Sequence, residues 1–146
     1  MKSLDLIRNV STIDEVLTSV LEIGNYDFFD PDNFTLTSLL QSGDFKLIDS
    51  EIIKIELLRL LKVYQHIDNM QKNFLQALDD NYFPMLLMKL DYIEFEAVDP
   101  EFFYGIEIRN YCAYTINETN QHIGNYKVAL EQVGKVAELI ERELSN

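Results

Sequence analysis

The most reactive side chains of this 146-residue sequence are two histidines and a single cysteine. Cys112 would act as a nucleophile only beside a histidine base in an electropositive setting. His122 lies ten residues further along the same predicted helix, about three turns away, and His66 reaches Cys112 only through tertiary packing. We therefore expect Cys112 to be a small buried hydrophobic residue, and both histidines to be ordinary surface or rim residues.

Carboxylates are numerous, but their spacing does not match that of known metal sites. Glu118 and His122 share a helix face, yet a di-iron bundle needs Glu-x-x-His pairs and carboxylates from other helices. A calcium loop needs ligands at alternating positions and a glycine at its sharp turn. Two acidic runs lack that pattern: Asp27, Asp30 and Asp32, and Asp91, Glu94, Glu96, Asp99 and Glu101. We expect solvated acidic loops, and we assign no catalytic residue, metal ligand or cofactor site.

Four tyrosines of the last third leave two interpretations open. Tyr104, Tyr111, Tyr114 and Tyr126 either line a pocket for a small ligand or pack between helices with their hydroxyls at the rim. We favour packing. The sequence contains no Walker loop, dinucleotide fingerprint, G-x-S-x-G or H-E-x-x-H motif.

The charge of the chain restricts its partners. The formal net charge is −13 and is spread along the sequence, which disfavours nucleic acids and anionic membrane surfaces. The excess favours solubility, or alternatively an acidic surface for a basic partner. One cysteine permits no intrachain disulfide, which fits a reducing compartment without excluding a periplasm. The sequence shows no stretch long and apolar enough for a membrane span and no signal-peptide hydrophobic region.

The scarcity of Gly (5) and Pro (3) favours a few long helices. Ser3 is expected to cap a short opening segment with Leu4, Ile7 and Val10. Thr12 and Glu15 form a capping box for the next helix, which Gly24 ends in the left-handed conformation. Residues 26–33 form a connection in which Phe28 and Phe29 pack onto the bundle.

The middle of the chain predicts a short helix over 34–41, stopped at 42–44, and a strong cap at Asp49-Ser50. A long helix follows over 51–78. One stripe holds Ile53, Leu57, Leu60, Tyr64, Ile67, Phe74 and Leu78, and a second face holds Ile52, Ile55, Leu58, Leu61 and Met70. A helix that is apolar on so many sides is expected to lie centrally.

Residues 79–81 are expected to cap or kink the chain before a helix over 81–92, with Pro84 in its first turn. Residues 93–98 alternate apolar and acidic side chains, but one strand makes no sheet, so we interpret them as a loop. Asp99-Pro100-Glu101 open the last helix, which runs to Leu144 or breaks near Gly105. Close approach of another helix would explain Gly124 and Gly134.

Apolar residues of this last helix recur every seven positions in two registers. One register holds Ile116, Ile123, Leu130, Ala137 and Leu144, and the other holds Thr119, Tyr126, Val133 and Ile140. Both are expected to fall on one packed stripe. The sequence thus predicts an all-α, antiparallel helical bundle of about four main helices with a short helical insertion, forming a single domain over 1–146.

The segment 39–51 (LLQSGDFKLIDSE), followed by Leu57, Leu58 and Tyr64, resembles a motif of an uncharacterised bacterial family. Its members carry one N-terminal transmembrane helix and a helical extracytoplasmic domain. The closing helix, with Arg109-Asn110 and residues 136–144, is similar to the last helix of that family. The resemblance covers about 35–70 and 103–144, and it implies a membrane-anchored, periplasmic or extracytoplasmic bundle. It supplies no catalytic residue and no activity.

These observations predict a non-enzymatic helical interaction or sensor-like domain. The expected partner is another protein or a second copy of the chain, with no nucleic acid, and with membrane contact only through an N-terminal anchor missing from this sequence. The alternative is an acidic binding module of the immunity or inhibitor type for a basic partner protein. An enzyme is the least favoured reading, because it would need a cleft that gathers several of the residues named above.

Overall fold

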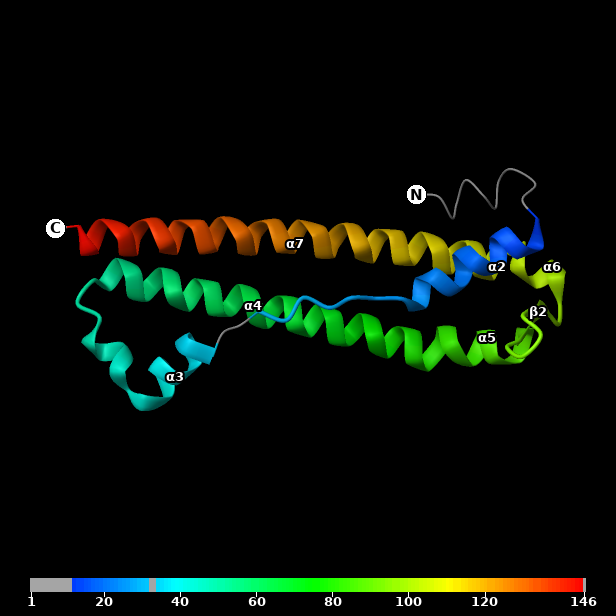
Figure 1. Ribbon diagram of the computed structural model, residues 1–146, viewed down its shortest axis with the longest axis horizontal. Coiled ribbons are helices and arrows are strands. Elements are labelled where there is room, and N and C mark those ends of the chain that lie inside the picture. Colours follow the sequence, from blue (N-terminus) through cyan, green and yellow to red (C-terminus); the bar gives the residue numbers. More distant parts are fainter. Residues whose placement is uncertain (1–11, 32–33, 146) are drawn as a thin grey trace. The chain divides into compact units, whose positions relative to one another are not determined.

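The structure is a computed structural model that describes residues 12–31 and 34–145 (Figure 1). The helical elements are α2 (Ile13–Leu21), η1 (Glu22–Gly24), α3 (Phe34–Ser42), η2 (Asp44–Leu47), α4 (Glu51–Ala77), η3 (Leu78–Tyr82), α5 (Phe83–Lys89), α6 (Pro100–Phe103) and α7 (Ile106–Leu144), and the strands are β1 (Leu90–Asp91) and β2 (Glu96–Ala97). The predicted all-α helical bundle is confirmed. The opening segment from Ser3 to Val10 lies outside the described residues.

The chain forms two compact units. Unit 1 consists of Met1–Phe28 and Lys72–Gln121, and unit 2 consists of Phe29–Gln71 and His122–Asn146. The helices α4 and α7 each contribute residues to both units. The single domain that the sequence suggests for 1–146 stays a prediction.

The first described helix begins at the capping box that the sequence predicts. The Glu15 backbone N–H donates to Thr12 Oγ1 at 3.4 Å, and the Thr12 N–H donates to Glu15 Oε2 at 2.9 Å. The prediction for Gly24 is wrong, since the left-handed glycine among the described residues is Gly43, not Gly24. Gly24 is needed for space instead, because a Cβ there would lie 3.0 Å from the Phe83 ring.

Unit 1 has a filled apolar core. Its buried members are Val16, Leu17, Val20, Ile23, Phe74, Leu78, Tyr82, Leu86, Leu90, Phe103, Ile108 and Cys112. The Tyr82 hydroxyl lies inside this core and donates to the Val20 carbonyl at 2.6 Å. Residues 78–82 form the π-helical turn η3, which joins α4 to α5 without a cap. Of the two alternatives predicted for 79–81, a cap or a kink, the structure has the kink, in the form of this π-helical turn.

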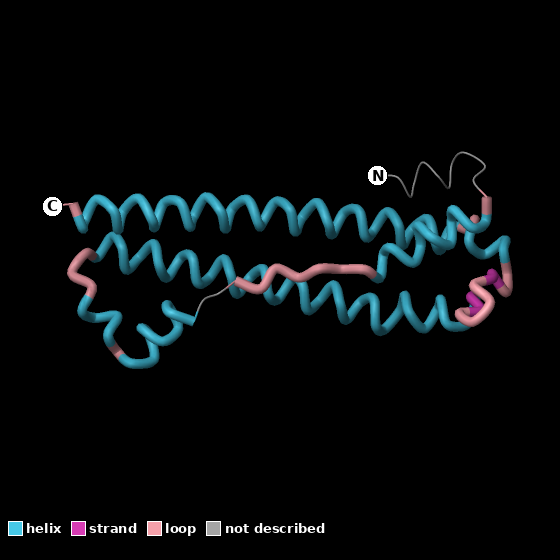
Figure 2. Tube along the Cα trace, in the orientation of Figure 1, coloured by secondary structure: helices cyan, strands magenta, loops and turns pink. Residues whose placement is uncertain are grey.

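The interpretation of 93–98 as a loop is wrong in part. Leu90 pairs with Ala97 and Asp91 with Glu96 in a short antiparallel hairpin, shown in magenta in Figure 2. The sequence misses the partner strand because Leu90 and Asp91 continue the pattern of the preceding helix. Asp91 Oδ1 accepts from the backbone N–H groups of Ile93 and Glu94 at 2.9 and 3.1 Å, which fixes the turn.

The start of the last helix confirms the predicted cap and the alternative of a break. The Asp99 side chain accepts from the Phe102 N–H at 3.4 Å and begins α6. Tyr104 and Gly105 then separate α6 from α7. The expected helix contacts at Gly124 and Gly134 are wrong, because a Cβ at either position would meet nothing within 4 Å.

Part of the predicted stripe of α7 is also wrong. Ile123 and Leu130 are 45% and 72% exposed, whereas the buried residues of α7 are Ile108, Cys112, His122, Ala129 and Val136. Three of these buried residues, His122, Ala129 and Val136, each lie one position before a residue of the predicted register. Neighbouring residues on a helix are about 100° apart, and apolar side chains occupy both registers, so periodicity alone does not separate them.

The helix α4 confirms one predicted face and not the other. Ile53, Leu60 and Ile67 are buried, as are Phe74 and Leu78 further along the same stripe. On the second face, Ile52, Ile55 and Leu58 are 61%, 47% and 40% exposed. No other element described by the structure covers these three side chains, so the predicted central position of this segment is wrong.

Replacing Tyr82 by Phe tests the packing of unit 1. The variant loses the hydroxyl that bonds the Val20 carbonyl, which should lower the free energy of unfolding by about 1 kcal/mol. Chemical denaturation monitored by circular dichroism measures the change. The control is Tyr92→Phe, because Tyr92 is 46% exposed and lies outside the core of unit 1. Equal stability of both variants and the unmodified protein would contradict this role of Tyr82.

Candidate functional site

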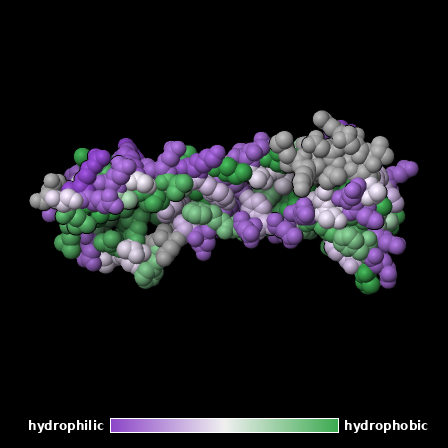
Figure 3. All heavy atoms as spheres, turned by 45° about the horizontal axis from the view of Figure 1, so that its top comes forward, coloured by the Kyte–Doolittle hydropathy of each residue, from purple (hydrophilic) through white to green (hydrophobic). Residues whose placement is uncertain are grey.

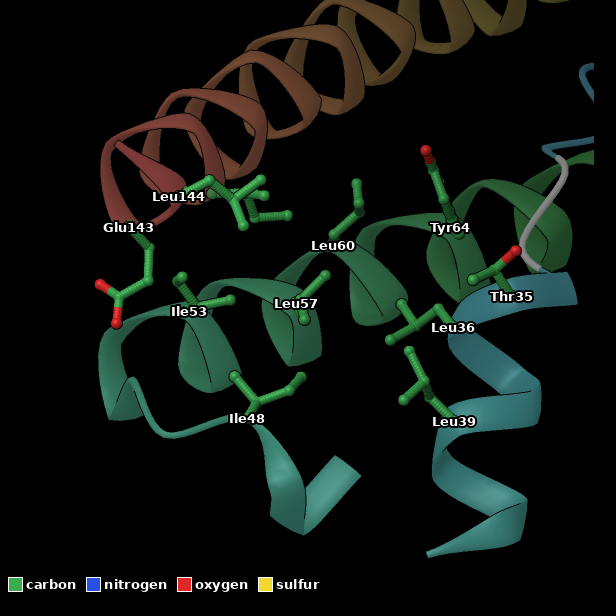
Figure 4. Close-up of a pocket in the computed structure, with 11 residues that line it drawn as sticks. Thr35, Leu36, Leu39, Ile48, Ile53, Leu57, Leu60, Tyr64, Glu143 and Leu144 are labelled. Atoms are coloured by element: carbon green, nitrogen blue, oxygen red, sulfur yellow. The ribbon is translucent and has the colours of Figure 1, made fainter. Parts of the chain in front are cut away.

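Unit 2 has an apolar cavity formed by α3, the connection to α4, the first turns of α4 and the end of α7. Gly43, with φ of 79°, ends α3 in the left-handed conformation and reverses the chain into η2. The Ser42 hydroxyl donates to Asp44 Oδ2 at 2.8 Å across this turn. The reversal places α3 and Ile48 opposite the first turns of α4 (Figure 4).

The cavity has a volume of about 460 Å³. Its lining consists of Thr35, Leu36, Leu39, Ile48, Ile53, Leu57, Leu60, Tyr64, Ile140, Glu143 and Leu144. Eight of these eleven side chains are aliphatic, so the wall is almost entirely hydrocarbon. Figure 3 shows hydrophobic atoms around a hollow in this part of unit 2. Protein interiors have few voids larger than a water molecule, whereas small-molecule sites measure about 300–1,000 Å³.

The polar groups of this cavity lie at its two ends. Figure 4 shows the Glu143 carboxylate at one end, beside Ile53, and the Tyr64 and Thr35 side chains at the other. Burial raises the pKa of the Tyr64 phenol, so it stays a neutral donor near pH 7. The lining residues that the structure describes include no lysine, arginine or histidine, so their one charged group is a carboxylate.

A buried glutamine holds the segment that leads to α3. Gln71 Oε1 accepts from the Phe29 N–H at 2.8 Å, and Gln71 Nε2 donates to the Phe29 carbonyl at 3.0 Å. The Tyr126 hydroxyl also donates to Gln71 Oε1, at 2.8 Å. The carboxamide thus pairs with the Phe29 backbone as a strand would, and it connects α4, α7 and this extended segment. We call these three residues the Gln71 clamp.

A second polar contact joins α4 to α7 near the cavity. Glu56 is 4% exposed and binds Gln132 Nε2 at 2.9 Å and Lys135 Nζ at 2.9 Å, together with Arg59. The hydrogen bonds from Gln132 and then Lys135, together with the positive charges of Arg59 and Lys135, lower the pKa of Glu56. The carboxylate is therefore ionised near neutral pH. It fixes the spacing of the helices that carry Ile53 and Ile140.

The structure does not bring the reactive side chains together. Cys112 is buried in the core of unit 1 as predicted, and burial raises the pKa of its thiol. His66 is exposed on α4, also as predicted. The prediction for His122 is wrong, since its side chain is 2% exposed in unit 2. Burial lowers its pKa, so the neutral imidazole is favoured there.

The four tyrosines pack against other side chains and do not line the cavity. The Tyr111 ring contacts Tyr82, and the Tyr114 ring contacts Phe74, at centroid distances of 5.2 and 6.0 Å. Tyr126 belongs to the Gln71 clamp, and Tyr104 is 40% exposed. These positions bear out packing over a shared tyrosine pocket.

The acidic run after α5 has local structural partners. Asp91 caps its own turn, and Asp99 binds Lys89 Nζ at 3.1 Å besides capping α6. Across residues 12–31 and 34–145, no three His, Cys, Asp or Glu side chains gather as a metal site would require.

The sequence did not predict the cavity, although several residues that line it were predicted to be apolar packing positions. Leu57, Leu60 and Tyr64 lie on the predicted apolar stripe of α4, which the sequence assigned to a filled core. The missing information was how closely the short helix α3 approaches α4. A nine-residue helix with few large side chains facing inward leaves the space open.

Comparison with known proteins identifies no relative: no family model, no curated protein and no solved structure matches this chain. The helices of the described ranges include none with the length and hydropathy needed to span a membrane.

Gln71→Leu tests the clamp. The substitution removes three hydrogen bonds around a buried side chain, so the free energy of unfolding should fall by about 1–3 kcal/mol. Gln65→Leu is the matched control, because Gln65 is exposed on the same helix and should change stability by less than about 0.5 kcal/mol. Urea denaturation compares them. Similar losses for both variants would rule out a special role for Gln71.

His122 should make stability depend on pH. Its folded-state pKa lies below the unfolded value, so the unfolded chain binds more protons in the window beneath about pH 6.5. The free energy of unfolding should therefore decrease as the pH is lowered through that window. This group contributes at most about 1.4 kcal/mol per pH unit.

The test compares stability against pH for His122→Gln and His66→Gln. We expect the His122 variant to lose part of the slope below about pH 6.5, and the His66 variant to keep that of the unmodified protein. An unchanged slope in His122→Gln would show that the buried imidazole does not contribute.

Proposed function

We propose that this protein is a non-enzymatic, sensor-like binding domain whose unit 2 cavity holds an aliphatic ligand. The observation that carries the proposal is an open space of about 460 Å³ with an almost wholly aliphatic wall. Filling such a space removes apolar surface from water, which contributes roughly 25 cal/mol for each Å² buried. The gain is available to a ligand because α3 does not fill the space itself.

The charges of the cavity select the head group. Among the described residues that line the cavity, Glu143 is the one charged residue, and none is a cation. A carboxylate or phosphate head group would be repelled, whereas an ammonium or an uncharged polar group would not. The favoured occupant is therefore an aliphatic chain with a cationic or uncharged head group. Tyr64 and Thr35 are the two hydroxyl-bearing residues of the lining, and both lie toward the other end.

The proposal includes a location outside the cytoplasm, with a membrane helix preceding this domain in the full-length protein. Its support is the resemblance of 35–70 and 103–144 to a family of anchored extracytoplasmic proteins. The DNA sequence upstream of Met1 tests this part, since it either encodes a hydrophobic span or does not.

Leu57→Trp tests the ligand site. Leu57 lines the cavity, so an indole at that position should fill it and weaken binding of dodecyltrimethylammonium by about ten-fold or more. The chain has no native tryptophan, so the new side chain is also a unique fluorescence reporter. Calorimetry below the micelle-forming concentration measures the dissociation constant.

Leu58→Trp is the matched control, because Leu58 neighbours Leu57 but is 40% exposed and does not line the cavity. We expect its affinity for dodecyltrimethylammonium to equal that of the unmodified protein. Dodecanoate, which has an anionic head group on a similar chain, should bind more weakly. Equal affinities of the two tryptophan variants, or tighter binding of dodecanoate, would refute the proposed site.

A further inference from the structure

The β1–β2 hairpin of unit 1 presents apolar side chains to solvent. Ile93 is 90% exposed and Val98 is 68% exposed. Hydrogen bonds hold the segment in this conformation: the Val98 N–H donates to the Lys89 carbonyl at 2.9 Å, and the Asp91 side chain accepts from the backbone of the turn. Phe95 has a φ of 57°, which is unusual for a bulky residue. A group of large apolar side chains held exposed beside one another is typical of an interaction surface.

A hollow lies between this hairpin and α2. Its volume is about 250 Å³, and its apolar wall includes Ile13, Leu17 and Phe95. Two carboxylates, Asp14 and Glu96, belong to the same lining, and both are exposed. The hollow thus combines a small apolar recess with negative charge at the solvent boundary.

The stretch of sequence that contains the hairpin is strongly acidic. From Asp79 to Glu107 the sequence has eight carboxylates and one cation, Lys89. That cation already binds Asp99 and lies 5.1 Å from the centroid of the Phe102 ring. Figure 3 shows hydrophobic and hydrophilic atoms intermixed in this part of unit 1. An anionic lipid surface would be repelled here, whereas a basic protein segment would be attracted.

We propose that the hollow between α2 and the β1–β2 hairpin docks a basic amphipathic segment of a partner protein. One apolar side chain of the partner enters the recess against Leu17 and Phe95. A lysine or arginine beside it pairs with Asp14 and Glu96, and Ile93 and Val98 extend the apolar contact. This surface involves only unit 1 residues, so it stands or falls independently of the unit 2 cavity.

The test uses the full chain and a fluorescent synthetic peptide of leucine and lysine with an amphipathic helical pattern. Asp14→Lys/Glu96→Lys should raise the dissociation constant about ten-fold or more in a fluorescence anisotropy titration. Asp79→Lys/Asp80→Lys is the matched control, because it changes the net charge of unit 1 equally at exposed residues outside the hollow. The control should weaken binding by no more than about three-fold, through the general field. Circular dichroism confirms that both variants are folded.

A second peptide in which glutamate replaces every lysine keeps the apolar pattern and should not bind. Equal weakening by the two double variants would overturn the proposal, because it would show attraction to net charge alone. Equal binding of the glutamate peptide would overturn it as well. Sedimentation of the protein with phosphatidylglycerol vesicles, without binding of the lysine peptide, would overturn the proposed protein partner and indicate a membrane surface instead.

Discussion

The pairing of the Gln71 carboxamide with the Phe29 backbone is the interaction on which the architecture of unit 2 depends. An extended segment has no helical hydrogen bonds of its own, so its backbone groups need partners where they are buried. Gln71 supplies both a donor and an acceptor, and Tyr126 completes the contact from α7. The segment that leads to α3 is thereby held against the two long helices, and α3 provides one wall of the cavity.

The two units bury different kinds of side chain. Unit 1 has a continuous apolar core around Tyr82 and Phe103. Unit 2 buries Glu56, Gln71 and His122 beside apolar residues such as Ile67 and Val136, and eight of its aliphatic side chains surround open space. Hydrogen bonds specify distance and direction, but each contributes little net stability. The hydrogen bonds of unit 2 therefore set the positions of its helices, while its cavity is not filled by apolar side chains. This contrast explains why a ligand would stabilise unit 2 in particular.

The sequence predicts features that depend on neighbouring residues along the chain. The capping box at Thr12, the caps at Asp99 and Ser50 and the buried stripe of α4 all follow from spacing within a few turns. It does not predict features that depend on distant residues. Nothing near His122 in the sequence indicates burial, and the strand at Leu90 is defined only by its partner at Ala97. The buried register of α7 could not be identified without the packed structure, because apolar residues occupy both the buried and the exposed register of this helix.

The cavity could not be predicted from the sequence for a related reason. An apolar stripe such as Ile53 and Leu57 indicates burial, but the pattern is the same whether a side chain or a ligand covers it. The volume left over depends on where Gly43 turns the chain and how α3 then approaches α4. Ligand binding in unit 2 is accordingly the claim for which direct measurement matters most.

Hydrogen–deuterium exchange with and without saturating dodecyltrimethylammonium tests that claim directly. We predict slower exchange in 35–39, 53–64 and 140–144, the segments that surround the cavity, with no change in the β1–β2 hairpin. Protection that is absent from these three segments, or that is spread evenly over both units, would contradict the assignment of the cavity as the ligand site.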